Sequence, residues 1–239
     1  MAKVYKLNKY IAHSGVCSRR KAAELVKAGK ITVNGEVIIQ PAFEVSVNDK
    51  VIYQGKTLKP TINHTYLLLN KPKNVLTTMS DDRGRKTVWD MVQDKVSDRV
   101  YPVGRLDRNT TGLLLITNDG DLARKLSHPS SDVIKSYIIT LEEPVTQAHL
   151  NDIRDGITLE DGPVPVDRVG YVEVKDKYRV SIDVHIGRNR IVRRIFESFG
   201  YTVKRLDRIY YAGLTKKGLP RGHSRQLTQE EVRMLKHFV

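Results

Sequence analysis

Residues 104–112 lead directly into the apolar run 113–116, and this junction constrains the fold more than any other stretch of the chain. An uninterrupted apolar run bounded by turn residues is typical of a buried strand. A loop that enters such a strand is held by a rigid platform and can present a side chain at a fixed angle. The loop has the sequence GRLDRNTTG, so its one carboxylate, Asp107, stands between Arg105 and Arg108.

Residue type alone leaves two interpretations of Asp107 open. Two neighbouring guanidinium groups favour a charged carboxylate, which suits a nucleophile better than a proton donor. An aspartate in a segment rich in Gly, Asn and Thr also commonly serves as a turn or cap residue.

The charge of the chain indicates a polyanionic partner. The 239 residues carry a formal net charge of +14, and residues 1–60 hold half of it, with 11 Lys and Arg against 4 Asp and Glu. Nucleic acid and an anionic membrane both fit such a surplus. No apolar run approaches the roughly 20 residues that cross a bilayer, and no signal peptide opens the chain. We therefore expect a cytoplasmic protein that binds nucleic acid and no membrane.

Neither a metal nor a cofactor is expected. Cys17 is the only cysteine, which excludes an intramolecular disulfide and fits a reducing compartment. The seven histidines are scattered without the spacing of metal ligands. The glycine patterns that cradle nucleotide phosphates are missing as well.

The N-terminal residues 1–60 predict a small domain of two helices and a hairpin. The expected elements are a helix over 7–13, a helix over 19–28 with Ser18 as N-cap, and strands 31–33 and 37–39 around the Asn34-Gly35 turn. Residues 54–65 have few large apolar side chains and include Pro60, which predicts a linker.

Arg19, Arg20 and Lys21 occupy the first turn of the second predicted helix. The helix dipole disfavours each cation there by about 0.3–1 kcal/mol. The cations and the free N–H groups of the helix start would together suit RNA phosphates, so we predict phosphate contacts. The alternative is a solvated run of charge.

Residues 66–239 predict a second domain that mixes strands and helices without a regular βαβ order. Strands are expected over 66–70, 133–141 and 178–186, and helices over 87–92, 144–154, 191–199 and 228–238, the last with Thr228 and Glu231 as a capping box. Such an order favours an α+β fold with a mixed, largely antiparallel sheet and flanking helices.

With these pieces in place, the chain resembles the RsuA/RluB/RluE/RluF family of bacterial ribosomal RNA pseudouridine synthases over nearly its whole length. The similar segments are 104–120 (the nucleophile motif), Leu69–Lys73, Lys135-Ser-Tyr137 and Gly187–Arg194. Residues 1–60 are similar to the small RNA-binding module named after ribosomal protein S-four. The third family motif usually has an acid at position 186 and a polar residue at 191. Here Ile186 and Ile191 depart from it, which puts the positioning of the substrate in doubt.

The resemblance implies an isomerase that needs no cofactor and no metal, because the reaction has no net gain or loss of electrons. Residues 85–88, 159–163 and 219–222 are most similar to the RluB type, which modifies 23S ribosomal RNA near the peptidyl transferase centre. The expected partner is therefore 23S ribosomal RNA or a precursor ribosomal particle, and we expect a monomer. The alternatives are a non-catalytic ribosome-assembly factor, a synthase acting on 16S ribosomal RNA, and an RNA methyltransferase.

The resemblance also implies roles for single residues. Asp107 becomes the catalytic aspartate, whether it attacks sugar or base or deprotonates the sugar. Tyr137 stacks on the target uracil, although by itself it also fits a core aromatic. Arg193 pairs with Asp107, where the alternative is a solvated charge on a helix face. The remaining RNA-binding candidates are Arg105, which would fill the gap left by a flipped base, and the phosphate-binding Arg188 and Arg190.

Overall fold

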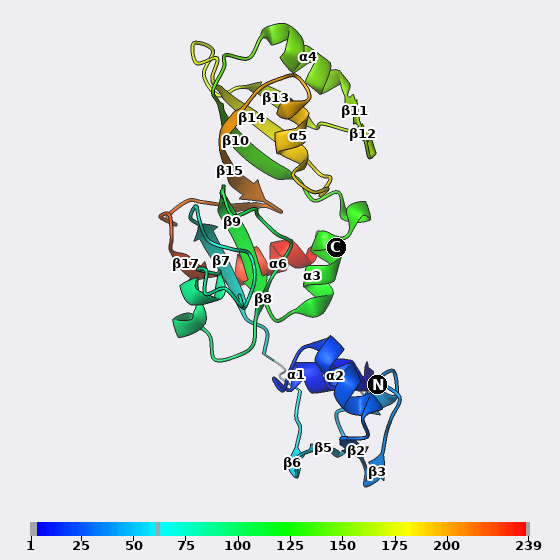
Figure 1. The fold of residues 1–239 in the computed structure, drawn as a ribbon. Helices are drawn as coiled ribbons and strands as arrows, with labels where there is room; N and C mark the ends of the chain where they lie inside the picture. Colours follow the sequence, from blue (N-terminus) through cyan, green and yellow to red (C-terminus); the bar gives the residue numbers. More distant parts are fainter. Residues whose placement is uncertain (1–3, 61–62, 238–239) are drawn as a thin grey trace. The chain divides into compact units, whose positions relative to one another are not determined.

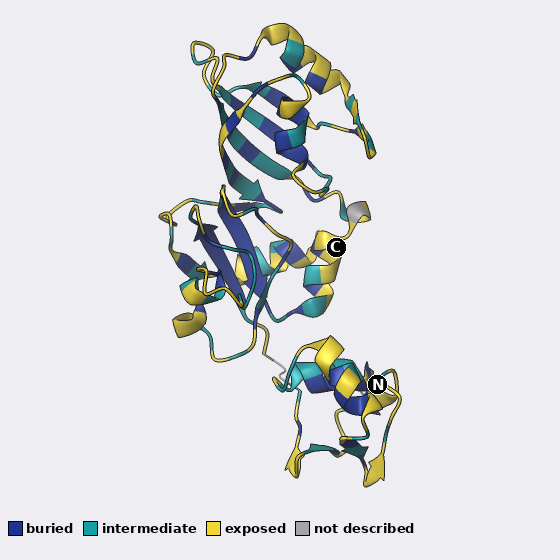
Figure 2. Cartoon of the chain, viewed as in Figure 1, coloured by how far each residue is buried: buried dark blue, intermediate teal, exposed yellow. Residues whose placement is uncertain are grey.

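The computed structural model describes residues 4–60 and 63–237, and the chain divides into two compact units between His64 and Thr65 (Figure 1). Each unit buries apolar side chains of its own, as the dark blue segments of Figure 2 show. A separate core is the physical requirement for a domain.

The N-terminal unit combines two helices with short antiparallel strands. Its elements are β1 (Val4–Lys6), α1 (Leu7–His13), α2 (Arg19–Lys27), β2 (Ile31–Val33), β3 (Glu36–Val37), β4 (Glu44–Ser46), β5 (Val51–Tyr53) and β6 (Lys56–Thr57). Strand β1 pairs with β4, and the other four follow the order β3-β2-β5-β6. Leu7 and Ile11 of α1, Val26 of α2 and Ile31 of β2 are fully buried and share one core.

Local signals in this unit are confirmed at the cap and at the turn. The Ser18 hydroxyl accepts a hydrogen bond from the Lys21 backbone N–H at 3.2 Å, as an N-cap does. Asn34 and Gly35 have φ values of 52° and 93°, which the predicted tight turn requires. Strand β3 ends at Val37 and is therefore shorter than the predicted strand.

The predicted linker over residues 54–65 is wrong in its first part. Strand β6 pairs with β5, and buried Leu58 donates its N–H to the Val51 carbonyl at 2.8 Å. The Tyr10 hydroxyl also donates to the Leu58 carbonyl at 3.2 Å. These residues therefore belong to the N-terminal unit. Exposed edge strands carry few apolar side chains, so composition did not separate this strand from a linker.

The second unit is built on a nine-stranded sheet whose main path is β13-β14-β10-β15-β9-β7-β17, with β16 beside β15 and β8 beside β9. Its strands are β7 (Tyr66–Lys71), β8 (Tyr101–Pro102), β9 (Thr110–Thr117), β10 (Lys135–Leu141), β13 (Arg168–Tyr171), β14 (Arg179–Val184), β15 (Val203–Tyr211), β16 (Leu214–Thr215) and β17 (Ser224–Gln226). A separate hairpin joins β11 (Ile157–Leu159) and β12 (Gly162–Val164). The pairings are antiparallel apart from β9 with β15, which confirms the expected α+β class.

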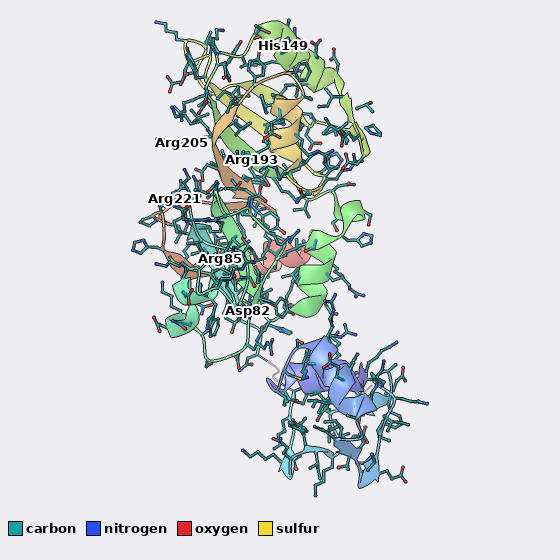
Figure 3. The ribbon with its side chains drawn as sticks, viewed as in Figure 1. Asp82, Arg85, His149, Arg193, Arg205 and Arg221 are labelled. Atoms are coloured by element: carbon teal, nitrogen blue, oxygen red, sulfur yellow. The ribbon has the colours of Figure 1, made fainter. Side chains whose placement is uncertain are left out.

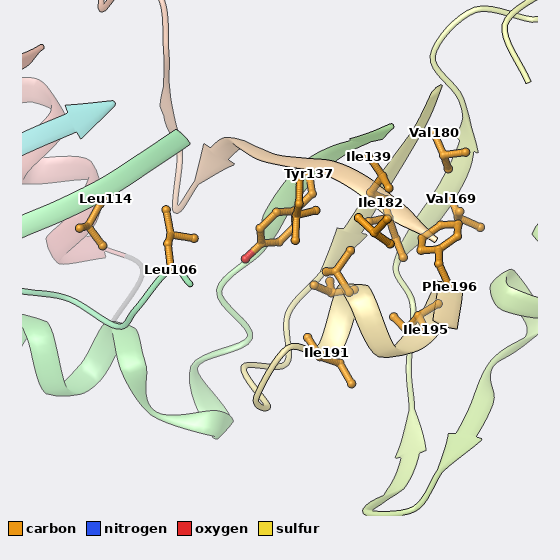
Figure 4. Close-up of a cluster of buried hydrophobic side chains, with 14 of the residues drawn as sticks. Leu106, Leu114, Tyr137, Ile139, Val169, Val180, Ile182, Ile191, Ile195 and Phe196 are labelled. Carbon is orange, nitrogen blue, oxygen red and sulfur yellow. The ribbon is translucent and has the colours of Figure 1, made fainter. Parts of the chain in front are cut away.

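Helices supply apolar side chains to two cores of this unit. The helices are α3 (Gly120–Ser127), α4 (Gln147–Asp155), α5 (Ile191–Glu197) and α6 (Gln229–His237). Ile195 and Phe196 of α5 pack with Tyr137 and Ile182 of the sheet (Figure 4). The second core contains Leu122 and Leu126 of α3, Leu235 of α6 and the strand residues Leu68, Leu113 and Leu115. Leu113 and Leu114 alternate between the two cores, so β9 is buried on both faces, as its sequence predicts.

Of two helices predicted from local sequence patterns, one is confirmed and the other is not. At the C-terminal helix, Thr228 and Glu231 form the expected capping box, with bonds of 3.1 Å and 2.9 Å between each backbone N–H and the other side chain. Phe238, the last residue of that prediction, lies outside the described residues. The predicted helix over 87–92 is wrong, because only Trp89–Met91 forms a 3-10 turn. There the Asp90 carboxylate binds the N–H and hydroxyl of Thr87, which favours a turn over a helix.

The two parts of the large sheet meet at a short parallel ladder between β9 and β15. Leu206 pairs with Thr110 and Arg208 with Gly112. Gly112 has φ of +108°, and a Cβ atom there would lie 2.2 Å from the Arg208 carbonyl oxygen. Only glycine fits this approach of two backbones.

We expect Gly112→Ala to lower the free energy of unfolding by at least about 2 kcal/mol, because it adds backbone strain and a clash with Arg208. Denaturant titration followed by circular dichroism would measure the loss. Gly170→Ala in β13 is the control, because its φ is not in the left-handed region and no atom lies within 4 Å of the added methyl. Equal midpoints for both variants would contradict the prediction.

Candidate active site

Asp107 lies on the loop between β8 and β9, immediately after a buried anchor. Leu106 is 5% exposed and joins the core, whereas Arg105 and Arg108 are exposed. The Asp107 carbonyl accepts a hydrogen bond from the Thr110 N–H at 3.0 Å, so Asp107 also begins a tight turn. The backbone therefore plays the turn role that the sequence left open, while the half-buried carboxylate is not used for it.

The Asp107 carboxylate has no hydrogen-bond or ion-pair partner among the residues that the structure describes. Its negative charge also interacts with two cations that are not its sequence neighbours, Arg193 and Lys71. Burial lowers the pKa of Arg193, and the charge of Asp107 opposes that shift. Asp107 acts in the same sense on the pKa of Lys71. Asp107 therefore interacts electrostatically with two cations that are distant in the sequence.

Arg193, labelled in Figure 3, comes from α5 and is 8% exposed, which excludes a solvated helix-face charge. Its Nη1 donates to the Val203 carbonyl at 3.0 Å, and its Nε is buried without a partner among the described residues. The direct pair expected between Arg193 and Asp107 is not formed in this structure. A buried guanidinium with a free donor is nevertheless a strong attractor for a carboxylate.

Tyr137 stands at the end of the core that faces the Asp107 loop. The residue is 9% exposed and packs in the cluster that contains Ile182 and Phe196. Its hydroxyl end points towards Leu106 (Figure 4). Tyr137 is therefore a core aromatic, as one interpretation of the sequence predicts, and its polar end is directed to the loop. Its stacking on a target uracil stays a prediction.

Lys71 contacts the loop that carries Asp107, and no role is predicted for it from the sequence. It ends β7, is fully buried, and its Nζ donates to the carbonyls of Val75 (2.8 Å), Pro72 (3.1 Å) and Arg108 (3.4 Å). Burial lowers its pKa to about 8; Asp107 opposes this shift and Arg221 adds to it. In the sequence, the Lys71-Pro72 pair indicates where the apolar strand ends. It does not indicate which groups the Lys71 ammonium group binds.

Two family models match the chain. Residues 65–198 match the RNA pseudouridylate synthase family, and residues 6–51 match the S4 domain. The chain belongs to the RNA pseudouridylate synthase family. It is thus an isomerase, and the predicted combination of an S4-type domain with a synthase domain is confirmed.

This pseudouridylate synthase is similar to curated proteins along almost its full length. It is 41% identical over 234 residues to the ribosomal large subunit pseudouridine synthase B of Bacillus subtilis (strain 168), covering 97% of this chain and 95% of that one. It is 40% identical over 233 residues to an uncharacterized RNA pseudouridine synthase of Aquifex aeolicus (strain VF5), covering 96% and 93%. A solved crystal structure of pseudouridylate synthase matches with a TM-score of 0.69 and 28% identity, covering 96% and 98%.

The predicted phosphate-binding arginines of the synthase domain have acidic partners in the protein. Arg188 donates to the Gly162 carbonyl at 3.1 Å and lies 3.4 Å from the Asp161 carboxylate. Arg190, whose φ is 48°, pairs with Glu197 at 2.8 Å. An RNA phosphate would therefore compete with a carboxylate at both positions.

The cations of the S4 domain stand at the start of α2. Arg19 and Arg20 are exposed, and Lys21 pairs with Glu24 at 2.9 Å. Within the described residues, no three His, Cys, Asp or Glu side chains form a group suited to a metal ion. In the same part of the chain, no helix is both long and apolar enough to cross a membrane.

The two departures from the third family motif have a structural reason. Ile191 is 6% exposed at the start of α5 and belongs to the core, and Ile186 packs against the same cluster. Both residues are therefore engaged in packing with this core.

A carboxylate on β15, Asp207, ties the site to the C-terminal segment. It accepts hydrogen bonds from the Thr111 hydroxyl at 2.8 Å, from Arg221 at 3.1 Å and from the Lys216 ammonium group. These bonds outweigh burial and lower the pKa of Asp207. The parallel ladder brings Thr111 opposite Asp207, and the chain after β15 turns back to bring Lys216 and Arg221 to it.

We expect Lys71 to make stability rise with pH above about pH 8. Its pKa is about 8 in the folded state against 10.5 for an ordinary lysine, so between these values the unfolded chain binds more protons. The free energy of unfolding of the wild type minus that of Lys71→Met should therefore grow by about 2–3 kcal/mol from pH 8 to 10.5. Denaturant titrations across this range would measure it. Exposed Lys73→Met is the control for charge loss, and a constant difference for Lys71→Met would refute the shift.

Proposed function

We propose that this synthase converts a uridine of 23S ribosomal RNA near the peptidyl transferase centre into pseudouridine, with Asp107 as its nucleophile. The Bacillus subtilis relative is named as an enzyme of the large ribosomal subunit, which supports the choice of RNA. The net charge of +14 suits a polyanion of that size. We propose that it acts as a monomer in the cytoplasm, on free RNA or on a precursor particle.

The observation that carries the proposal is the unpartnered carboxylate of Asp107 beside two buried cations. A carboxylate that served only as a turn cap would be bonded to backbone N–H groups. The Asp107 side chain is left available, while Lys71 and Arg193 attract its negative charge. This arrangement suits a nucleophile in a partly water-free site.

The reaction balances without an electron donor or acceptor. The bond between uracil N1 and ribose C1′ breaks, the base turns, and a bond forms between C5 and C1′. C5 loses a proton and N1 gains one, so the composition and mass of the RNA stay constant. Catalysis needs a carboxylate at the sugar or base and a group that helps move the C5 proton.

The other candidate residues have positions that suit their proposed roles. Tyr137 is the proposed platform for the uracil ring, with its hydroxyl directed towards the loop. Arg193 is proposed to turn its free Nε towards Asp107 when the substrate excludes water. Exposed Arg105 is proposed to occupy the space left by the flipped base.

We expect Asp107→Asn to lower pseudouridine formation by at least about 10³-fold, because the amide keeps the shape of the side chain and loses its charge. Carbodiimide labelling and primer extension on 23S RNA fragments would measure the product and its position. Binding of the RNA should change little, and Asp82→Asn, in the exposed loop before Arg83, is the control.

Other results would contradict the proposal or change part of it. Wild-type activity of Asp107→Asn would remove the nucleophile assignment. RNA binding without any change of the RNA by the wild type would favour an assembly factor, and a product only in 16S RNA would change the substrate. A mass gain of roughly one CH₂ group with S-adenosylmethionine would indicate methylation, because pseudouridylation leaves the mass unchanged.

We expect replacement of Arg19, Arg20 and Lys21 by glutamine to weaken the salt dependence of RNA binding. Removing one cation that binds a phosphate lowers the slope of log K against log salt by about 0.7–0.9. Filter binding at several salt concentrations would measure the slope. The control is Arg124→Gln on α3, whose side chain is 75% exposed. An unchanged slope would refute phosphate contacts at the start of α2.

A further inference from the structure

Thr77 contacts the Asp107 loop through two hydrogen bonds of its hydroxyl. The hydroxyl donates to the Leu106 carbonyl at 2.6 Å and accepts from the Leu106 N–H at 3.3 Å. The two residues are 29 positions apart, so these bonds are not those of a local turn. The adjacent Thr78 differs, because its hydroxyl bonds to the Ser80 carbonyl and N–H within its own loop.

The Leu106 carbonyl belongs to the peptide unit that leads into Asp107. A peptide unit is planar, so fixing its oxygen fixes the plane from which the next Cα departs. The following peptide unit is held as well, since the Asp107 carbonyl accepts from the Thr110 N–H at 3.0 Å. Beyond it, the Arg108 carbonyl accepts from the Asn74 N–H at 2.9 Å and from Lys71. The direction of the Asp107 side chain is thereby set by backbone contacts on both sides.

Thr77 is itself held in place by its chain neighbours. Leu76 donates its N–H to the Lys86 carbonyl and accepts from the Val88 N–H, each at 2.9 Å. Buried Val75 and Val88 share the core beneath these bonds. Thr77 therefore connects the packed segment around Val75 and Leu76 to the loop that carries Asp107.

We propose that Thr77 is a positioning residue for Asp107, with its hydroxyl fixing the peptide unit from which the nucleophile projects. The proposal rests on the proposed function of Asp107. A nucleophile displaced by about 1 Å loses roughly 10²-fold in rate even where binding is unchanged. The role of Thr77 is thus one of geometry, because its hydroxyl is already bonded to Leu106.

The test compares Thr77→Val, which keeps the shape and removes the hydroxyl, with Thr77→Ser, which keeps the hydroxyl. Under single-turnover conditions with 23S RNA fragments, Thr77→Val should lose about 10²-fold in rate while its Kd for the RNA stays within about twofold. Thr77→Ser should retain most of the rate. Thr78→Val is the matched control and should behave as the wild type. A wild-type rate for Thr77→Val, or a loss matched by weaker RNA binding, would overturn the proposal.

A second measurement needs no activity. The Leu106 amide should exchange with solvent hydrogen faster in Thr77→Val than in the wild type and Thr77→Ser, because its acceptor is removed. Equal protection in all three would overturn the positioning role. If the wild type modified no RNA, the proposed function would fail, and this exchange experiment would still decide whether Thr77 holds the loop.

Discussion

The short parallel ladder between β9 and β15 is the constraint on which the synthase domain depends. Across it, paired residues form one row through four strands: Lys71 opposite Gly112, Gly112 opposite Arg208, and Arg208 opposite Tyr137. The row connects the end of β7, the start of β9 and the strand that carries Tyr137. Because Gly112 has no side chain, the two backbones approach closely enough to keep this row in register. Asp107 lies on the loop that leads into β9, so the contact at Gly112 helps to fix the position of that loop.

Several buried or half-buried cations of this domain bind backbone carbonyls instead of carboxylates. Lys71, Lys135, Arg193 and Arg208 donate to backbone carbonyls, and none has a carboxylate within ion-pair distance among the described residues. Burial lowers the pKa of both lysines to about 8. Carbonyl dipoles offset only part of the cost of burying a charge, so this region retains a strong preference for an anion. Asp107 is the carboxylate whose charge opposes the lowered pKa of both Lys71 and Arg193, and Asp167 has that effect on Lys135.

The sequence could predict what a few neighbouring residues decide. The Ser18 cap and the buried strand after the Asp107 loop are of this kind, and the structure has both. The helix expected around Asp90 fails because that carboxylate competes for the backbone and leaves a single 3-10 turn. Strand β6 was missed because packing does not select apolar side chains at the edge of a sheet. The burial of Lys71 and the bonds of Thr77 to the Asp107 loop depend on contacts between segments that are distant in the sequence. The spacing of residues along the chain does not predict such contacts.

The residues proposed for catalysis and those proposed for RNA binding are held in the protein in different ways. Backbone groups, the half-buried Thr77 hydroxyl and the buried Lys71 ammonium group hold the loop around Asp107, so its geometry does not depend on side chains that face the solvent. The charge of Arg188 and Arg190 predicts RNA contact, yet each is already held by a carboxylate. Such pairs contribute little to stability in water, so exchanging a carboxylate for a phosphate costs little. The proposed phosphate contacts of Arg188 and Arg190 can therefore be altered without disturbing the loop, since the two sets of interactions use different side chains.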